Sequence, residues 1–408
     1  MMNIGDTKIM KENIREEEIL KIVKEYGEVS RLELAETFGL TSARISKVTK
    51  NLLEKKIIIE KSVGESSGGR PPVYLSINNE KFKDILGINL TSNRMLYITL
   101  GKINGEIFKK KKIAIDLLSK DEQEDILKVV DDIIGKEISQ NPNIGALSII
   151  ITGSVDEEKG VSVMSPHYSL KTPKVVEYFE RKYNLPVLLE NDVRAMALVE
   201  KQIGSCRNVK NFVVFNLGEG IGSANCIDKK IYKGHNSMAG EAGHIVINTN
   251  SIRKCSCGKR GCLEAESSEM AIIKKITSEI KIGKYSILKD ILKEKEFLTI
   301  KDILYGVKKR DFLVIQVMTE AMEYIARGLN ILISVLDPEK IILVGEIFSS
   351  KFLMDTLKFE LNKISLDVHS YAIEPTKLGE DLYFYSPIAV VVENIFENRY
   401  FTQKYTKD

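Results

Sequence analysis

The stretch from Gly240 to Glu266, GEAGHIVINTNSIRKCSCGKRGCLEAE, constrains the fold of this chain more than any other segment. Its three cysteines follow a C-x-C-x4-C spacing with glycines between the last two, so a tightly folded backbone can aim three sulfurs at one point. A histidine upstream would complete the tetrahedral Cys3His set that zinc accepts in closed, structural sites. The predicted zinc ligands are His244, Cys255, Cys257 and Cys262.

Two other interpretations of these cysteines are weaker. A disulfide is disfavoured because Cys255 and Cys257 are too close in the chain to pair easily, and nothing else suggests secretion. Three free buried thiols beside an unrelated histidine remain the alternative to a zinc site. The charged N-terminus is unlike a signal peptide, and no apolar run is long enough to span a bilayer. Five cysteines, three of them in this cluster, suit a reducing compartment, so we expect a cytoplasmic protein without a membrane partner.

Glu241 and Glu264 frame the cysteine cluster. Carboxylates beside a metal site are costly to bury unless something donates hydrogen bonds to them, as a polyhydroxylated ligand does. The second ring nitrogen of a metal-bound histidine could connect the metal to such a ligand. The stretch resembles the ROK family (repressors, open reading frames and sugar kinases), because it matches the family signatures E-x-G-H and C-x-C-G-x-x-G-C-x-E at every specified position.

From Ile85 onward, short strand-like runs alternate with helical patterns, which is typical of an α/β fold with ligands at the strand ends. The resemblance implies the two-lobed actin-like, ribonuclease-H-like fold of the sugar kinases, with a sugar cleft between the lobes. We expect this domain over residues 79–408, with lobe one at about 84–194 plus 388–408 and lobe two at about 195–387. The expected strands are Met95–Leu100, Ala146–Ile151, Asn211–Asn216 and Lys340–Val344, and the expected helices are 121–139, 172–184, 192–203, 267–281, 311–336 and an amphipathic tail helix, Ile388–Phe396.

Residues 186–195, PVLLENDVRA, read as a buried strand that ends at the mouth of a helix. An aspartate there would be unremarkable alone, since aspartate commonly caps helices. The resemblance implies that this N-D element contacts sugar hydroxyls and that residues 153–167 form a further sugar-side loop. The family's kinases often carry asparagine where this chain has His167, so the identity of the sugar stays open. The predicted sugar ligands are Asn191, Asp192, Glu241, His244, Glu264 and His167.

The nucleotide side departs from the kinases of the family. Phosphoryl transfer needs a cradle of backbone amides and a metal-holding acid. Where those kinases have a D-x-G-G-T-type hairpin, this chain has Asn89 for the acid, with Thr91 and Ser92 for the glycines. Glu219 and Glu346 stand in the second and third nucleotide loops, where an acid would repel a triphosphate. We therefore predict no catalytic residues and no enzymatic activity.

The first 78 residues have the pattern of a helix-turn-helix. Ser30 and Glu33 form a capping box that opens a short helix ending at Phe38, and Gly39 makes the turn into a second helix. The second helix buries its apolar face and leaves polar and basic side chains outside, as a helix that enters the major groove does. The predicted DNA contacts on this helix are Ser42, Arg44, Lys47, Lys50 and Asn51.

Two strand-like runs, Ile57–Val63 and Val73–Ile77, flank GESSGGRPP and predict a wing with Arg70 at its tip, suited to a narrow minor groove. Residues 44–72 carry seven basic and three acidic side chains, whereas residues 1–43 carry six basic and nine acidic ones. This local surplus suits phosphate binding. A small protein-interaction domain with a solvated basic face is the alternative. The run Lys109–Lys112 is interpreted as a solvated sheet edge.

Together these patterns predict a winged helix-turn-helix at residues 1–78 followed by a sugar kinase-like domain with a structural zinc ion. The expected function is a sugar-responsive, DNA-binding transcriptional repressor that acts as a dimer or tetramer on operator DNA. A monosaccharide in the degenerate kinase cleft would relieve repression. The alternatives are an active sugar kinase with a fused DNA-binding segment, and a regulator that does not depend on a ligand. The direction of control also stays open, since some regulators of this type activate.

Overall fold

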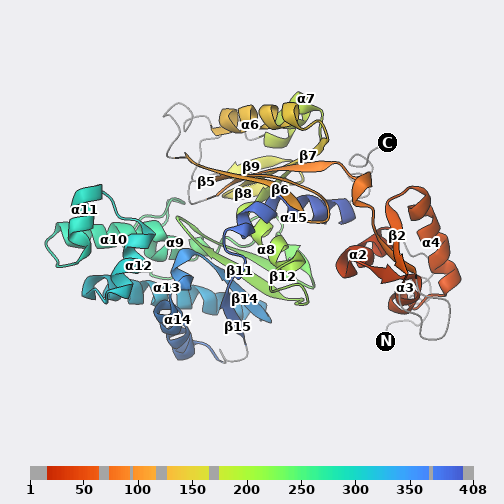
Figure 1. Cartoon of the computed structure of the whole chain (residues 1–408). Coiled ribbons are helices and arrows are strands. Elements are labelled where there is room, and N and C mark those ends of the chain that lie inside the picture. The colour runs from red at the N-terminus through yellow and green to blue at the C-terminus, as the bar shows by residue number, and fades with distance from the viewer. Residues whose placement is uncertain are drawn as a thin grey trace.

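The computed structural model of this chain describes residues 16–63, 73–91, 95–115, 126–164, 174–366 and 371–397. A small N-terminal unit lies at one end of the molecule, beside a larger α/β body with two five-stranded sheets (Figure 1). None of the helices in these parts of the chain is long and apolar enough to cross a membrane.

The N-terminal unit packs three helices on a three-stranded antiparallel sheet of order β1-β3-β2. Its elements are α2 (Glu16–Tyr26), β1 (Val29–Ser30), α3 (Arg31–Phe38), α4 (Ser42–Glu54), β2 (Ile58–Val63) and β3 (Val73–Ile77). The predicted capping box is confirmed, since the Ser30 hydroxyl accepts from the amide of Glu33 while the Glu33 carboxylate accepts from the amide of Ser30. Gly39 ends α3 at a φ of 62°, a left-handed conformation that favours glycine. Ile45 and Leu52 turn the inner face of α4 into the core of this unit.

The first large sheet has the order β10-β7-β4-β5-β6, with β10, β7 and β4 parallel. Its strands are β4 (Asp84–Leu90), β5 (Met95–Gly101), β6 (Ile107–Ala114), β7 (Ile144–Ile151) and β10 (Val187–Asn191). The helices α6 (Ile126–Gln140) and α7 (Val175–Tyr183) cover its outer face (Figure 1). A small hairpin of β8 (Ser154–Asp156) and β9 (Val161–Met164) follows β7.

The second large sheet has the order β13-β12-β11-β14-β15. Its strands are β11 (Phe212–Leu217), β12 (Ile221–Ile227), β13 (Lys230–Tyr232), β14 (Lys340–Val344) and β15 (Ala372–Pro375). A group of helices shares one apolar core with this sheet: α9 (Leu263–Ser267), α10 (Glu269–Lys281), α11 (Leu288–Lys295), α12 (Ile300–Lys308), α13 (Phe312–Leu336) and α14 (Lys351–Ile364).

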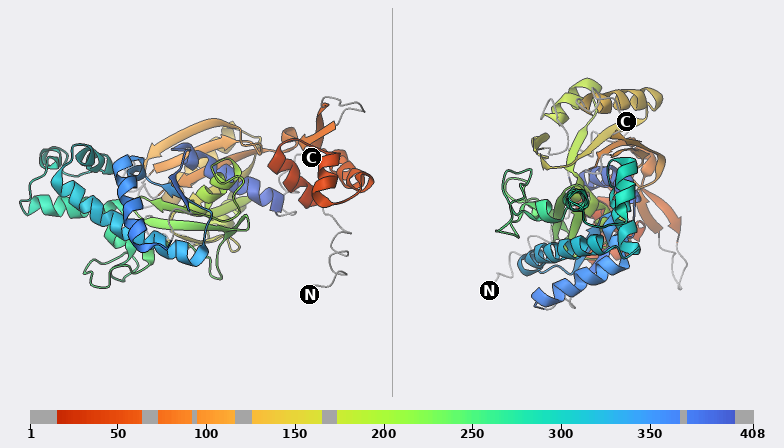
Figure 2. Two further views of the ribbon diagram at one scale, coloured as in Figure 1. Left: turned by 90° about the horizontal axis from the view of Figure 1, so that it is seen from below. Right: turned by 90° about the vertical axis from the view of Figure 1, so that its left-hand side faces the viewer.

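Two helices lie between the sheets, α8 (Asp192–Gln202) and α15 (Asp381–Glu397) (Figures 1 and 2). Met196 of α8 and Ala389 of α15 share a buried cluster with Ile150 of the first sheet and Ile342 of the second. At its other end α15 reaches the N-terminal unit, where Phe396 belongs to the same core as the residues of α2 and α4. This middle layer therefore touches both sheets and the N-terminal unit.

Most of the predicted elements are present, with shifted ends. The predicted strand Lys340–Val344 matches β14, whereas the tail helix is longer than predicted and begins at Asp381. The predicted helix 267–281 is wrong at its start, because α9 ends at Ser267 and Ser268 begins a new helix by accepting from the amide of Ala271. The lysine run lies on β6, an edge strand as predicted, and three of its lysines pair with Glu137, Glu380 and Asp381. The domain limits stay predictions.

Candidate functional site

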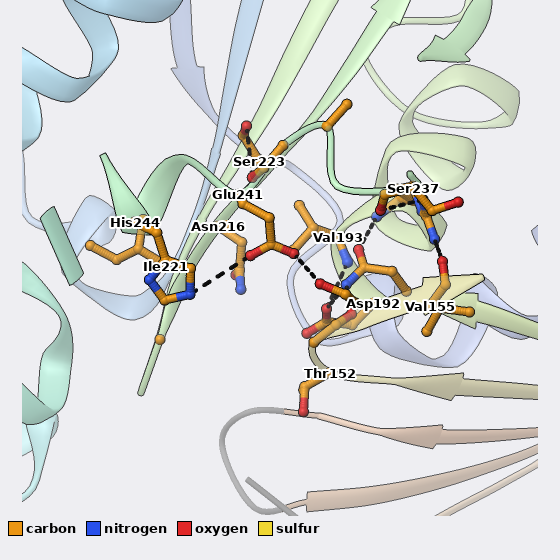
Figure 3. Close-up of a pocket in the computed structure, with 18 of the residues that line it drawn as sticks. Thr152, Val155, Asp192, Val193, Asn216, Ile221, Ser223, Ser237, Glu241 and His244 are labelled. Carbon is orange, nitrogen blue, oxygen red and sulfur yellow. Dashed lines mark hydrogen bonds and ion pairs between the residues drawn. The ribbon is translucent and has the colours of Figure 1, made fainter. Parts of the chain in front are cut away.

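A cavity of about 70 Å³ lies between the two large sheets, at the start of α8 (Figure 3). Most of its lining residues are polar, and they come from the β7–β8 turn, the β10–α8 junction, the β11–β12 turn, residues 237–244 and Glu264. Five of the predicted sugar ligands line it: Asn191, Asp192, Glu241, His244 and Glu264. The sixth, His167, lies outside the described residues.

The β10–α8 junction fixes the two residues of the N-D element. Asn191 caps α8, since its side-chain oxygen accepts from the amide of Arg194 at 3.0 Å. Its amide nitrogen donates to the carbonyl of Gly153 at 2.9 Å and to the Asp192 carboxylate at 3.0 Å. Burial raises the pKa of Asp192 to about 7, and the nearby Glu241 carboxylate adds to the increase. Asp192 is therefore a buried carboxyl group that is poised to exchange hydrogen bonds with a ligand hydroxyl.

Glu241 lies between Asp192 and His244 in the cavity (Figure 3). One of its carboxylate oxygens accepts from the Ser154 hydroxyl at 2.8 Å, and the other lies 3.8 Å from Nε2 of His244. Glu264 is held more firmly. Its two oxygens accept from the amide of Ile221 at 3.1 Å and from the Ser256 hydroxyl at 3.1 Å, so it connects the β11–β12 turn with the cysteine loop.

The four predicted metal ligands come together beside the cavity. Their ligand atoms lie within 4.8 Å of one another, so the cluster of His244, Cys255, Cys257 and Cys262 could hold a metal ion. The sulfurs of Cys257 and Cys262 are 3.7 Å apart, and Nδ1 of His244 is 3.4 Å from the sulfur of Cys255. These separations suit a tetrahedron with metal–sulfur bonds of about 2.3 Å, whose edges measure roughly 3.5–3.8 Å. His244 thus turns Nδ1 to the Cys255 thiol and Nε2 to Glu241, whereas its predicted link to a bound sugar stays a prediction.

Glycine is required at one point of this loop. Gly261 has a φ of 72°, and a Cβ there would lie 1.9 Å from the carbonyl oxygen of Asn248. The loop can close on its cysteines only because the two backbone segments approach so closely.

Sequence reasoning missed Arg194, which also lines the cavity. It is 2% exposed and bonds Glu190 at 2.7 Å, lies 3.6 Å from Glu157, and donates to the carbonyl of Val155 at 2.9 Å. Among the described lining residues it is the sole lysine or arginine. The i,i+4 spacing of Glu190 and Arg194 could have predicted their ion pair from the sequence. The contact of Arg194 with Glu157 could not be predicted, because it depends on the tertiary fold. The cavity therefore offers several carboxylates and one cation whose charge is already matched.

Two residues that replace the expected phosphate-cradle motif are engaged with the backbone. Asn89 is fully buried and donates to the backbone carbonyl of Tyr383 at 2.9 Å, while the Thr91 hydroxyl donates to the carbonyl of Met95 at 3.0 Å. These side chains anchor the β4–β5 hairpin and the start of α15. Beyond the predicted Glu219 and Glu346, the structure adds Glu269.

Burial raises the pKa of Glu269 to about 8, and the carboxylates of Glu346 and Glu219 raise it further. Carboxylates from two other segments of the chain therefore raise the pKa of Glu269. Nothing in the local sequence around Glu269 marks it, because its partners come from the β11–β12 turn and from the turn after β14.

The predicted DNA contacts of α4 lie on its outer side. Ser42, Lys47, Lys50 and Asn51 are exposed, whereas Arg44 is half-buried. Asn51 donates to the Glu16 carboxylate of α2, so its amide is already engaged in the free protein. Arg70 lies outside the described residues.

Comparison with known proteins places these features in context. The ROK family model matches residues 86–381. The xylose repressor of Caldicellulosiruptor bescii is 27% identical over 387 residues, 92% of this chain and 95% of the relative. The DNA-binding transcriptional dual regulator NagC of Escherichia coli K12 is 25% identical over 365 residues, 89% of this chain and 88% of the relative.

Solved structures show the same fold. A ROK family transcriptional regulator described as a homolog of the E. coli MLC protein is similar with a TM-score of 0.78 and 27% identity, covering 95% of this chain and 97% of that one. A ROK family glucokinase from Streptomyces griseus, solved with glucose and AMPPNP, has a TM-score of 0.64 at 19% identity, covering 75% of this chain and 98% of that one. The second likeness concerns the fold alone.

Proposed function

Since this chain belongs to the ROK family, we propose that it is a sugar-responsive transcriptional repressor that releases operator DNA when a monosaccharide enters the cavity between its sheets. The observation that carries the proposal is the contrast across the cleft. Hydroxyl-binding carboxylates converge on one side, and an acidic wall replaces the phosphate cradle on the other. Relatives named as sugar repressors match the chain along nearly its whole length, which supports the same conclusion.

The cavity favours a neutral sugar. Asp192, Glu241 and Glu264 accept hydrogen bonds from hydroxyl groups, whereas a phosphate or carboxylate on the ligand would meet the same acids at short range. Arg194 does not offset them, because its charge is matched by Glu190 and Glu157. The volume of about 70 Å³ suits a single sugar ring better than an oligosaccharide.

DNA binding falls to the N-terminal unit, in the manner of a winged helix-turn-helix. The turn at Gly39 and the exposed outer side of α4 support this assignment. In this proposal α4 enters the major groove, and the hairpin of β2 and β3 carries Arg70 to the minor groove. Dimers would bind a roughly palindromic, A/T-rich operator in the cytoplasm.

The metal in this proposal is zinc, held by His244, Cys255, Cys257 and Cys262. The donor set of three thiols and one imidazole is typical of structural zinc, and its spacing fits tetrahedral bonds. Zinc would stabilise the loop that positions Glu241 and Glu264 rather than take part in a reaction. The same loop would then align the sugar ligands from one side of the cavity.

Phosphoryl transfer is not part of this function. Asn89 and Thr91 occupy the hairpin that would cradle phosphates, and Glu219, Glu269 and Glu346 would repel a triphosphate. A coupled assay with ATP and a panel of pentoses and hexoses should show no phosphorylation above background, and measurable turnover of any of these sugars would favour the kinase alternative.

The route from sugar to DNA runs along α8. This helix begins at Asp192 in the cavity and ends at Gln202, where Lys201 and Gln202 bond Glu393 of α15. Glu393 also lies 3.6 Å from Lys24 in α2 of the N-terminal unit. A shift of α8 on sugar binding would therefore reach the DNA-binding unit through one carboxylate.

Calorimetry tests the coupling. If sugar and operator favour different states, bound operator must weaken sugar binding by the same factor by which sugar weakens operator binding. We expect a factor of roughly 5 to 150. Equal sugar affinities with and without operator would rule out sugar-controlled repression and favour a regulator that does not depend on this ligand.

The variant Asp192→Asn tests the cavity itself. It should leave operator binding intact and abolish release by sugar, because the amide keeps only one acceptor oxygen and cannot carry the negative charge that strengthens hydrogen bonds from ligand hydroxyls. A reporter strain carrying this variant should stay repressed when the sugar is supplied. Normal induction in that strain would remove Asp192 from the sugar site.

A further inference from the structure

Asn216 lines the cavity between the two large sheets, and the sequence did not predict a role for it. It stands on β11, where Phe212 and Val214 are fully buried in the cluster that packs around α8 and α15. Because alternate residues of a strand face the same side of a sheet, Asn216 continues this apolar row toward the cavity. A carboxamide therefore ends a row of side chains that is otherwise apolar.

The Asn216 side chain is buried but has no protein partner. The residue is 5% exposed, and none of the residues that the structure describes makes a hydrogen bond with its carboxamide. Figure 3 shows the amide end turned away from the strand and into the cavity. A buried amide without a partner lowers the stability of the fold, so a ligand that bonds it makes an interaction that the protein leaves open.

The cavity is rich in acceptors, and several of its donors are already engaged. Asp192, Glu241 and Glu264 present carboxyl groups. The side-chain nitrogen of Asn191 already donates twice, to a backbone carbonyl and to the Asp192 carboxylate. The Ser154 hydroxyl donates to Glu241 at 2.8 Å. The carboxamide on β11 adds two N–H donors that no group in the described part of the chain engages.

These donors matter for a sugar. A hydroxyl group has one proton to donate and two lone pairs that accept. When a carboxylate takes the proton, the lone pairs still need a donor, and a buried hydroxyl without one costs free energy. A hydroxyl held by a carboxylate on one side and by the Asn216 amide on the other would have both kinds of partner.

Resting on the sugar-binding function proposed for the cavity, we propose that Asn216 is a specificity-determining residue, which bonds one hydroxyl group of the sugar and makes the cavity reject sugars that lack it. A site built to hydrogen-bond a hydroxyl strongly rejects an analogue without that group, because the buried polar group of the protein is left unpaired. An apolar side chain at the same place would discriminate less, since it loses no hydrogen bond when the hydroxyl is absent.

Calorimetry of the full chain with D-xylose, D-glucose, D-mannose, D-fructose and N-acetyl-D-glucosamine identifies the sugar that binds most tightly. The same titrations are then made with monodeoxy analogues of that sugar, each of which lacks a different hydroxyl. The Kd of the wild type for one analogue should exceed that for the parent sugar by roughly tenfold or more, and in Asn216→Leu this ratio should fall to about threefold or less. The ratios for the other analogues should stay as in the wild type, because the carboxyl groups are unchanged.

A second measurement separates recognition from a structural role. The sugar-free Asn216→Leu protein should melt at a higher temperature than the wild type, because leucine has the branched shape of asparagine without the unpaired amide. Asn216→Val gives the same comparison with a smaller side chain. An asparagine that only supports the fold would give the opposite shift.

Asn225→Leu is the matched control, since Asn225 is a buried asparagine on the neighbouring strand β12 and lies outside the lining of the cavity. It should keep the wild-type affinity and the wild-type ratios. The inference is overturned if Asn216→Leu keeps every wild-type ratio, or if both Asn216 variants melt below the wild type. A wild type that binds none of these sugars would instead contradict the proposed function, and the role of Asn216 would fall with it.

Discussion

The carboxyl group of Glu269 interacts electrostatically with two other acids, Glu346 and Glu219. Its pKa of about 8, raised from 4.5 by burial and by Glu346 and Glu219, means that the folded protein binds this proton more tightly than the unfolded chain does. The associated stability is complete below about pH 4.5 and is lost as the pH rises to about 8. The protonation of this one side chain therefore makes the stability of the fold depend on pH.

The variant Glu269→Gln should remove this dependence. We expect it to unfold at higher denaturant than the wild type at pH 8.5, by roughly 1–2 kcal/mol, and to differ little near pH 5. Urea unfolding at both pH values measures the difference. Glu294→Gln, an exposed acid on α11, is the control and should shift neither value. A Glu269→Gln benefit that is equal at both pH values would contradict the raised pKa.

The cysteine cluster gives a second prediction for single residues. Cys257→Ser should lower the metal content and the free energy of unfolding together, by about 2–4 kcal/mol, since structural zinc contributes directly to folding. Cys226→Ser removes a buried thiol outside the cluster and should keep the metal. Elemental analysis and denaturation of both variants give the answer, and wild-type protein purified without any zinc would refute the assignment.

Among the elements, α4 and α8 differ in how much of their surface is buried. The inner face of α4 is fixed by Ile45 and Leu52, which leaves its outer side to the solvent. The middle helix α8 is buried along most of its length, with Asn191 as its cap and Asp192 as its first residue. An exposed helix can follow a groove in DNA, whereas a helix packed on both sides transmits a displacement from one end to the other.

The variant Lys47→Ala/Lys50→Ala tests the role of α4. We expect operator affinity to fall at least tenfold and the salt dependence of binding to become shallower by about one to two ions, if one or both lysines contact phosphates. Lys289→Ala/Lys293→Ala on α11 is the matched control and should bind normally. Electrophoretic mobility shifts at several salt concentrations measure both quantities. An unchanged salt slope would exclude these lysines from the DNA interface.

For the whole molecule, the important contact is the junction of α2, α8 and α15 at Glu393. Two sheets and the N-terminal unit meet around these helices, so a movement at the cavity between the sheets has a packed path to the N-terminal unit. The variant Glu393→Gln should keep sugar binding and operator binding separately, but reduce the factor by which each weakens the other at least threefold.

A matched control for this variant is Glu320→Gln, which removes a carboxylate paired with Lys275 far from the junction. Its coupling factor should equal that of the wild type. Calorimetric sugar titrations with and without operator compare the three proteins. If Glu393→Gln retains full coupling, the signal takes another path through the molecule.

The sequence alone determined the features that depend on neighbours along the chain. The capping box at Ser30, the turn at Gly39 and the strand Lys340–Val344 follow from local spacing, and the structure confirms them. The side chains of the predicted ligands His244, Cys255, Cys257 and Cys262 lie together, and the metal itself stays a prediction. The resemblance to the ROK family allowed the overall fold to be predicted as well, because the family signatures are themselves local sequence patterns. The break at Ser268 was missed, since helical periodicity continues across it.

Only the tertiary structure decided which distant groups meet. The raised pKa of Glu269 and the matched charge of Arg194 depend on segments that are far apart in sequence. Electrostatic interactions act through space over several ångströms, and they change with burial, so no local pattern records them. Local spacing therefore predicted the helices, the strands and the clustered histidine and cysteine side chains. The packing of α8 and α15 between the sheets decided which charged groups from distant segments lie together.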